Sequence, residues 1–159
     1  MIKLLGVLLL SIASVIPGFI LNHRLVVRKK YLNEMSLLTL NIKNRIIDGG
    51  ECVSEILLKE SNGCFSFLKN LSLNNLTSFD EMKNILINKG FESTDSIVIA
   101  EFFGGLGRMD TKGERDNCDY YHNKFCCLIN DAENELKDKG KLYKSLFVSL
   151  GIAVFIIFI

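Results

Sequence analysis

Proline, tryptophan and alternating strand patterns are all scarce in this sequence. There is one proline, Pro17, and there is no tryptophan among the 159 residues. Segments in which apolar and polar side chains alternate are few, and this scarcity disfavours a β-sheet protein. The sequence therefore predicts an all-α fold, and its length is sufficient for one domain with a sizeable core.

Neither sign of charge is in excess. The 19 basic and 18 acidic side chains leave a net charge of +1. A basic excess is typical of nucleic-acid binding, and a strong acidic excess is typical of disorder. Both classes are disfavoured, and we expect no nucleic-acid partner.

A disulfide framework is also absent. The five cysteines include no CxxC pair, and an odd count argues against an oxidising compartment for the central region. Cys118, His122 and Cys126 share one face of a predicted helix, as metal ligands can at this spacing. The two cysteines lie about 12 Å apart along the helix, so both cannot reach one ion. We expect buried, inert thiols, with a thiol or metal enzyme as a distant alternative.

Catalytic patterns are lacking elsewhere in the chain. No Ser/His/Asp or Cys/His pairing has support from the sequence. Gly104-Gly105-Leu106-Gly107 precedes a helix, as phosphate loops do, but it lacks the GxxxxGK[ST] arrangement and follows a helix. We interpret it as a turn between helices. The sequence predicts no enzyme, no metal, no cofactor and no small-molecule substrate.

Charged residues are missing from a run near the N-terminus. Leu4 to Leu21 comprises 18 residues without charge. At about 1.5 Å per residue, they approach the ~30 Å hydrocarbon core of a bilayer as a helix. A cleaved signal peptide ending near Ala13 is the alternative, but the apolar run continues beyond that residue. We therefore expect a membrane anchor over residues 1–22.

A second uncharged run ends the chain. Its 14 residues, Leu146 to Ile159, reach only about 21 Å as a helix. Leu142 and Tyr143 extend the run if the Lys144 ammonium reaches to the interface. We expect a C-terminal membrane segment over residues 142–159.

Basic residues flank both runs on the same side. Four basic residues follow the first run: Arg24, Arg28, Lys29 and Lys30. Two lysines and one tyrosine precede the second run: Lys141, Tyr143 and Lys144. By the positive-inside rule, both clusters place residues 23–141 in the cytoplasm. The prediction is a cytoplasmic helical domain between two membrane segments.

The central domain reads as a compact bundle of about six helices with short connections. Predicted helices cover residues 23–48, 51–61, 64–71, 78–89 and 96–103, and a long final helix begins near Asp110. The first carries an apolar stripe of Leu32, Met35, Leu38, Ile42 and Ile46, and the last carries one of Cys118, Tyr121, Phe125, Leu128, Ala132 and Leu136.

Helix starts and turns have recognisable signals. Thr111 with Glu114 forms a capping-box pattern at the start of the long helix, and Asp110 adds an acidic cap. Thr94 or Asp95 is the expected cap of the preceding helix. Leu106, Gly107 and Asp110 mark the turn between them, which is either a simple fold connection or a partner contact.

Three segments resemble the stage III sporulation protein AB family. The opening KLLGVLLLSIAS resembles the family's N-terminus, and KGKLYKSLFVSLG resembles the approach to its final membrane segment. The most specific is EFFGGLGRMD, which resembles the family's glycine and aspartate turn at Leu106, Gly107 and Asp110.

The resemblance implies a non-enzymatic membrane platform subunit in the mother cell of a sporulating bacterium. It implies membership of a channel complex between mother cell and forespore, and a secretion-type ATPase as partner. The soluble part is expected to be similar to cytoplasmic domains of type II secretion and type IV pilus platform proteins. The alternative is a secreted or membrane-attached helical binding protein with a cleaved signal peptide.

Overall fold

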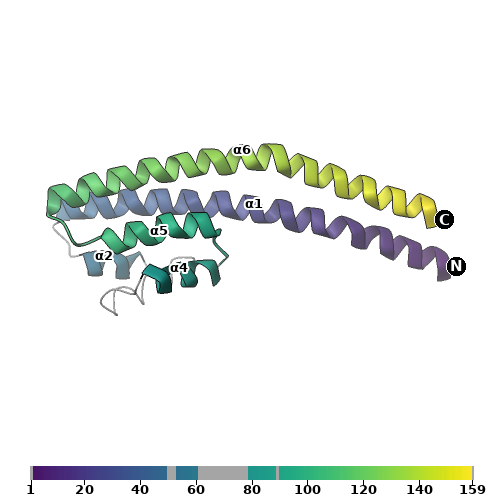
Figure 1. Cartoon of the computed structure of the whole chain (residues 1–159), viewed down its shortest axis with the longest axis horizontal. Helices are drawn as coiled ribbons and strands as arrows, with labels where there is room; N and C mark the ends of the chain where they lie inside the picture. Colours follow the sequence, from purple (N-terminus) through teal and green to yellow (C-terminus); the bar gives the residue numbers. More distant parts are fainter. Residues whose placement is uncertain (1, 50–52, 61–78, 89, 159) are drawn as a thin grey trace. The chain divides into compact units, whose positions relative to one another are not determined.

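The computed structural model describes residues 2–49, 53–60, 79–88 and 90–158. These residues form helices and contain no strand, which confirms the all-α class. The helices are α1 (Ile2–Gly49), α2 (Val53–Lys59), α4 (Phe79–Asn88), α5 (Ser93–Gly105) and α6 (Thr111–Phe158), labelled in Figure 1. The predicted helix 64–71 lies outside the described residues, so the count of six helices stays a prediction.

Two compact units divide the chain. Unit 1 comprises Met1–Lys29 and Asn130–Ile159, and unit 2 comprises Lys30–Ile129. Helices α1 and α6 each contribute residues to both units. The domain boundaries predicted at residues 22 and 141 are not tested by this division and stay predictions.

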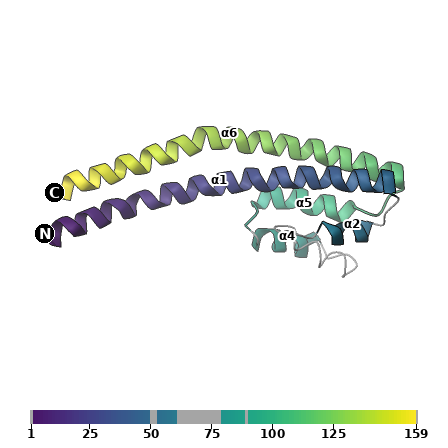
Figure 2. The same ribbon diagram turned by 180° about the vertical axis from the view of Figure 1, so that it is seen from behind.

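Unit 1 is an antiparallel pair made by the first part of α1 and the last part of α6. Figures 1 and 2 show the two helices side by side from opposite directions, with the N- and C-terminal ends at the same end of the unit. A Cβ atom added to Gly18 would lie 2.8 Å from the Cβ atom of Phe147. One added to Gly140 would lie 2.7 Å from Asn22 Oδ1. Glycine is required at Gly18 because a larger residue would push the helices apart, whereas at Gly140 the Asn22 side chain could rotate away.

Unit 2 has a hydrophobic core to which all its described helices contribute. The α1 stripe predicted from the sequence is confirmed, because its five members are at most 8% exposed: Leu32, Met35, Leu38, Ile42 and Ile46. Ile56 and Leu57 of α2 and Met82 and Leu86 of α4 are buried as well. The 3.6-residue period of these sequences thus identifies the buried faces of three helices.

The α6 stripe is confirmed in unit 2. Cys118 and Phe125 are fully buried, and Tyr121 and Leu128 pack against the core partly buried. The Phe125 ring meets the ring of Phe102 edge to face, with centroids 6.1 Å apart. Aromatic pairs of this geometry contribute more than the burial of their area alone.

The start of α5 differs from the sequence prediction. The helix begins at Ser93, and its N-cap is Glu92 without a side-chain capping bond. Thr94 and Asp95 therefore lie inside the first turn, and the prediction that one of them is the cap was wrong. Asp95 is 1% exposed, in a turn where an acidic side chain suits the helix dipole.

The predicted glycine turn between α5 and α6 is also shorter than the sequence suggested. Gly104 and Gly105 belong to α5, and no close contact requires glycine at either position. Of these three glycines, only Gly107 adopts the left-handed region, with φ of 81°. The chain therefore turns at Gly107, and two of the three glycines predicted to break it continue the helix instead.

Candidate membrane flank and partner-contact turn

The turn from Leu106 to Asp110 joins α5 to α6 inside unit 2. Leu106 is 7% exposed and belongs to the core, so its side chain is not available to a partner. Gly107 to Asp110 are exposed, and the Met109 side chain is 54% exposed. A partner could therefore contact this turn only at the exposed residues Gly107 to Asp110.

Asp110 caps α6. Its Oδ1 atom accepts a hydrogen bond from the Gly113 N–H at 2.9 Å, and its carbonyl accepts the Glu114 N–H at 2.8 Å. Glu114 Oε1 reaches back and accepts the Met109 N–H at 2.9 Å. The reciprocal pattern is a capping box shifted by one residue, so the capping role assigned to Thr111 was wrong and that assigned to Asp110 is confirmed.

Glu114 is an unusual component of this cap. Its side chain is 3% exposed, and Oε2 has no hydrogen-bond partner among the described residues. The nearby Cys118 thiol is fully buried, and burial together with the Glu114 carboxylate raises the pKa of that thiol to about 12. Only thiolates react readily, so Cys118 is inert at neutral pH.

The three candidate metal ligands on α6 do not form one site. Cys118 is buried, whereas Cys126 is exposed. His122 Nδ1 lies 3.0 Å from Ser36 Oγ of α1, and its Nε2 lies 3.7 Å from Cys126 Sγ. Within the described residues, no group of three His, Cys, Asp or Glu side chains could hold a metal ion.

The basic flank of unit 1 separates into two sets. The first set is bound to glutamates of α6: Arg28 lies 2.6 Å from Glu135, and Lys29 lies 3.2 Å from Glu133. Lys139 donates a hydrogen bond that lowers the pKa of Glu135, and Lys137 does the same for Glu133. Each of the two carboxylates thus pairs with two cations, and together they balance half of the positive charge at this level of the helix pair.

The second set lies one turn closer to the apolar ends of both helices. Arg24, Lys141 and Lys144 are exposed, and among the described residues no carboxylate forms an ion pair with them. Tyr143, beside Lys144, is partly buried. Sequence alone placed all these residues in one flank and could not separate the neutralised cations from the others.

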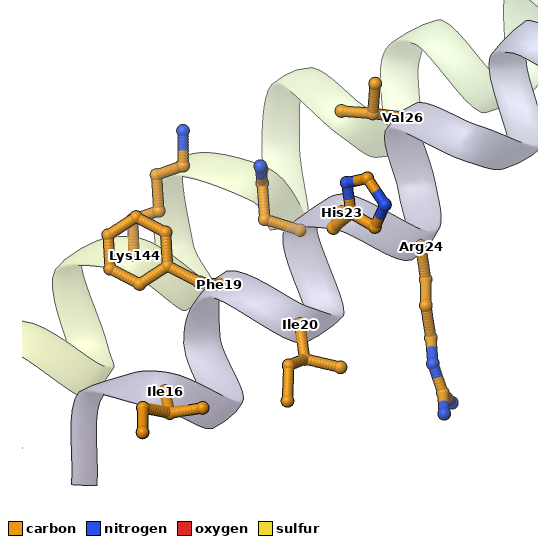
Figure 3. Close-up of a pocket in the computed structure, with 8 residues that line it drawn as sticks. Ile16, Phe19, Ile20, His23, Arg24, Val26 and Lys144 are labelled. Atoms are coloured by element: carbon orange, nitrogen blue, oxygen red, sulfur yellow. The ribbon is translucent and has the colours of Figure 1, made fainter. Parts of the chain in front are cut away.

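An open groove of about 730 Å³ runs along α1 at this level (Figure 3). Its apolar end consists of Ile16, Phe19 and Ile20, and each of these side chains is at least 50% exposed. Its polar end holds cationic and neutral polar side chains, from Asn22, His23, Arg24 and Lys144. Only the basic residues of this groove stand out in the sequence, because its apolar wall falls inside an apolar run.

The last part of α6 exposes large apolar side chains. Leu146, Ile152 and Ile157 are 50%, 56% and 75% exposed. Among the described residues, α6 is the one helix long and apolar enough to cross a membrane. The side chains of residues 2–5 and 7–12 lie outside the described set, so the N-terminal membrane segment stays a prediction.

Comparison with known proteins identifies the family. The family described as stage III sporulation protein AB matches residues 3–159. The chain belongs to this family. Membership of the stage III sporulation protein AB family is consistent with a role in sporulation. The resemblance noted in the sequence is confirmed. No curated protein and no solved structure matches the chain.

Proposed function

We propose that the chain is a non-enzymatic platform subunit of the channel complex that links mother cell and forespore. Unit 2 lies in the mother-cell cytoplasm in this proposal, and the apolar ends of α1 and α6 lie in the mother-cell membrane. The partner is a secretion-type ATPase, as for the platform proteins of type II secretion and type IV pilus systems.

The family match over residues 3–159 is the observation that carries the proposal, because it extends through both units. The exposed apolar side chains near the end of α6 support a membrane location, since lipid would remove them from water. The packed core of unit 2 supports a stable domain able to bind a protein partner.

The turn before α6 is the candidate contact for the ATPase. It is exposed from Gly107 to Asp110, and loops held by a packed scaffold often carry binding. The helix that follows it, α6, continues to the apolar end of the chain. A partner bound at the turn would thus contact the first residues of the helix that enters the membrane.

Two substitutions at Asp110 separate its capping role from a contact role. Asp110→Ala removes the acceptor of the Gly113 N–H, so we expect the free energy of unfolding to fall by about 1 kcal/mol. Asp110→Asn keeps an acceptor at the cap and should unfold like wild type. Denaturant titration of the full-length protein in detergent measures both values.

Co-purification from solubilised membranes of sporulating cells tests the function with the same variants. We expect the ATPase to be recovered with tagged wild-type protein and equally with Asp110→Asn, because the carboxylate acts as a cap. Loss of the ATPase from Asp110→Asn alone would show that the carboxylate is itself a contact. Failure to recover the ATPase with stable wild-type protein would contradict the platform proposal.

A further inference from the structure

We propose that unit 1 holds one anionic phospholipid in the groove along α1. Its phosphate is bound by Arg24, Lys141 and Lys144, and one acyl chain lies over Ile16, Phe19 and Ile20. This proposal rests on the membrane location of unit 1 and goes beyond the platform role.

The α1 side chains that line the groove are apolar at Ile16, Phe19 and Ile20, polar from Asn22 to Arg24, and apolar again at Val26. Figure 3 shows Ile16, Phe19 and Ile20 before His23 and Arg24 along α1, and Asn22 also lines the polar part of the groove. The nine residues from Ile16 to Arg24 span about 12 Å of helix. A phospholipid has the same order of parts, because its acyl chain is joined to a charged headgroup at the membrane surface.

The charge at the polar end is positive and lacks a carboxylate partner among the described residues. Arg28, Lys29 and Lys139 form ion pairs with glutamates farther from the apolar ends, whereas Arg24 and Lys144 do not. Basic pockets between membrane helices on the cytoplasmic side suit acidic headgroups. A second apolar helix would cover Phe19 but would leave these cations without a counter-charge.

A second groove of about 330 Å³ adjoins the first. The two share Asn22, Val26 and Lys144, and the second adds Lys141 beside Gly140. A Cβ atom at Gly140 would lie 2.7 Å from Asn22 Oδ1, so this part of α6 lies close to α1. Lys144 of α6 therefore lines both grooves, with Arg24 of α1 in the first and Lys141 in the second.

The absence of tryptophan permits a direct test. Phe19→Trp places the only indole of the full-length protein on a side chain that is 58% exposed in the groove. The variant is reconstituted in nanodiscs of phosphatidylcholine that contain a small, fixed fraction of brominated lipid. Bromine quenches indole fluorescence at contact, so quenching reports which lipid occupies the groove.

We expect brominated phosphatidylglycerol to quench with at least about fivefold higher apparent affinity than brominated phosphatidylcholine, because one cation near an anionic headgroup gives about fivefold and the proposed site has three. The triple variant Arg24→Gln, Lys141→Gln and Lys144→Gln should lose this preference. The matched triple variant is Arg28→Gln, Lys29→Gln and Lys139→Gln, which removes the same charge from ion-paired positions. This variant should keep the preference for phosphatidylglycerol.

Three results would overturn the proposal. Equal quenching by both lipids would show that the groove has no headgroup preference. Equal loss of preference in the two triple variants would assign the effect to general surface charge. Weak quenching by either lipid would show that a protein surface, such as a second copy, covers the groove. None of these measurements requires the ATPase, so failure of the platform proposal would leave the lipid result unchanged.

Discussion

Phe125→Ala should lower the free energy of unfolding of unit 2 by about 3–5 kcal/mol. The ring is fully buried and contacts Phe102 and Tyr121, whose ring centroids lie 6.1 and 6.5 Å away. Removing it leaves a cavity among residues of α5 and α6 that cannot fully collapse. This loss is a large part of the ~5–15 kcal/mol that stabilises a typical domain.

Tyr120→Ala is the matched control for this variant. Tyr120 is an aromatic residue on the same helix, but its side chain is 59% exposed. Denaturant titration of the full-length protein in detergent should show a change of less than about 1 kcal/mol for Tyr120→Ala. Equal effects of the two variants would contradict the placement of Phe125 at the centre of the core.

Gly18→Leu should destabilise the helix pair of unit 1 by about 1–3 kcal/mol. Even the Cβ atom of a new side chain would lie 2.8 Å from the Phe147 Cβ atom, and neither atom can move without its backbone. The helices must separate or shift, and the close packing between them is lost.

Gly6→Leu is the control because it makes the same substitution in the same helix. A Cβ atom at Gly6 has no heavy atom within 4 Å. Leucine has a higher helix propensity than glycine, so this variant should be neutral or slightly stabilising. Denaturant titration in detergent compares the two, and a destabilisation of the same size in both would contradict the close approach at Gly18.

The buried faces of the helices could be predicted from the sequence. The stripe from Leu32 to Ile46 and the stripe through Phe125 follow the helical period, and their members in unit 2 are buried or packed partly buried against the core. The end of α4 was also predictable, since Gly90 has φ of 94° and its N–H bonds to the Ile87 carbonyl. Local sequence determines these features because they depend on neighbours within one or two turns.

Features that depend on distant residues could not be predicted. Gly105 continues α5 and Asp95 is buried, because packing against the rest of unit 2 outweighs the local preference of these residues. Likewise, the close approach of Gly18 to Phe147 and the ion pair between Glu135 and Arg28 could not be predicted from the sequence. These pairs are more than 100 residues apart, and no spacing rule within a helix connects them.

The candidate site was predicted in part for the same reason. The cap at Asp110 has a local signal and was found, whereas the burial of Leu106 depends on the core of unit 2. The apolar wall of the groove was missed because Phe19 and Ile20 are indistinguishable in sequence from other residues of the apolar run. Only the packing of α1 with α6 separates a groove from the surface around it.

The central claim is that both ends of the chain lie in the membrane and that unit 2 faces the cytoplasm. Cysteine labelling in intact cells tests it most directly, with Asn88→Cys as the probe because Asn88 is exposed on α4. The native cysteines are first replaced, and Ile2→Cys serves as the control for the opposite side. We predict that a membrane-impermeant maleimide labels position 2 in intact cells and position 88 only after permeabilisation. Labelling of position 88 in intact cells would contradict the account.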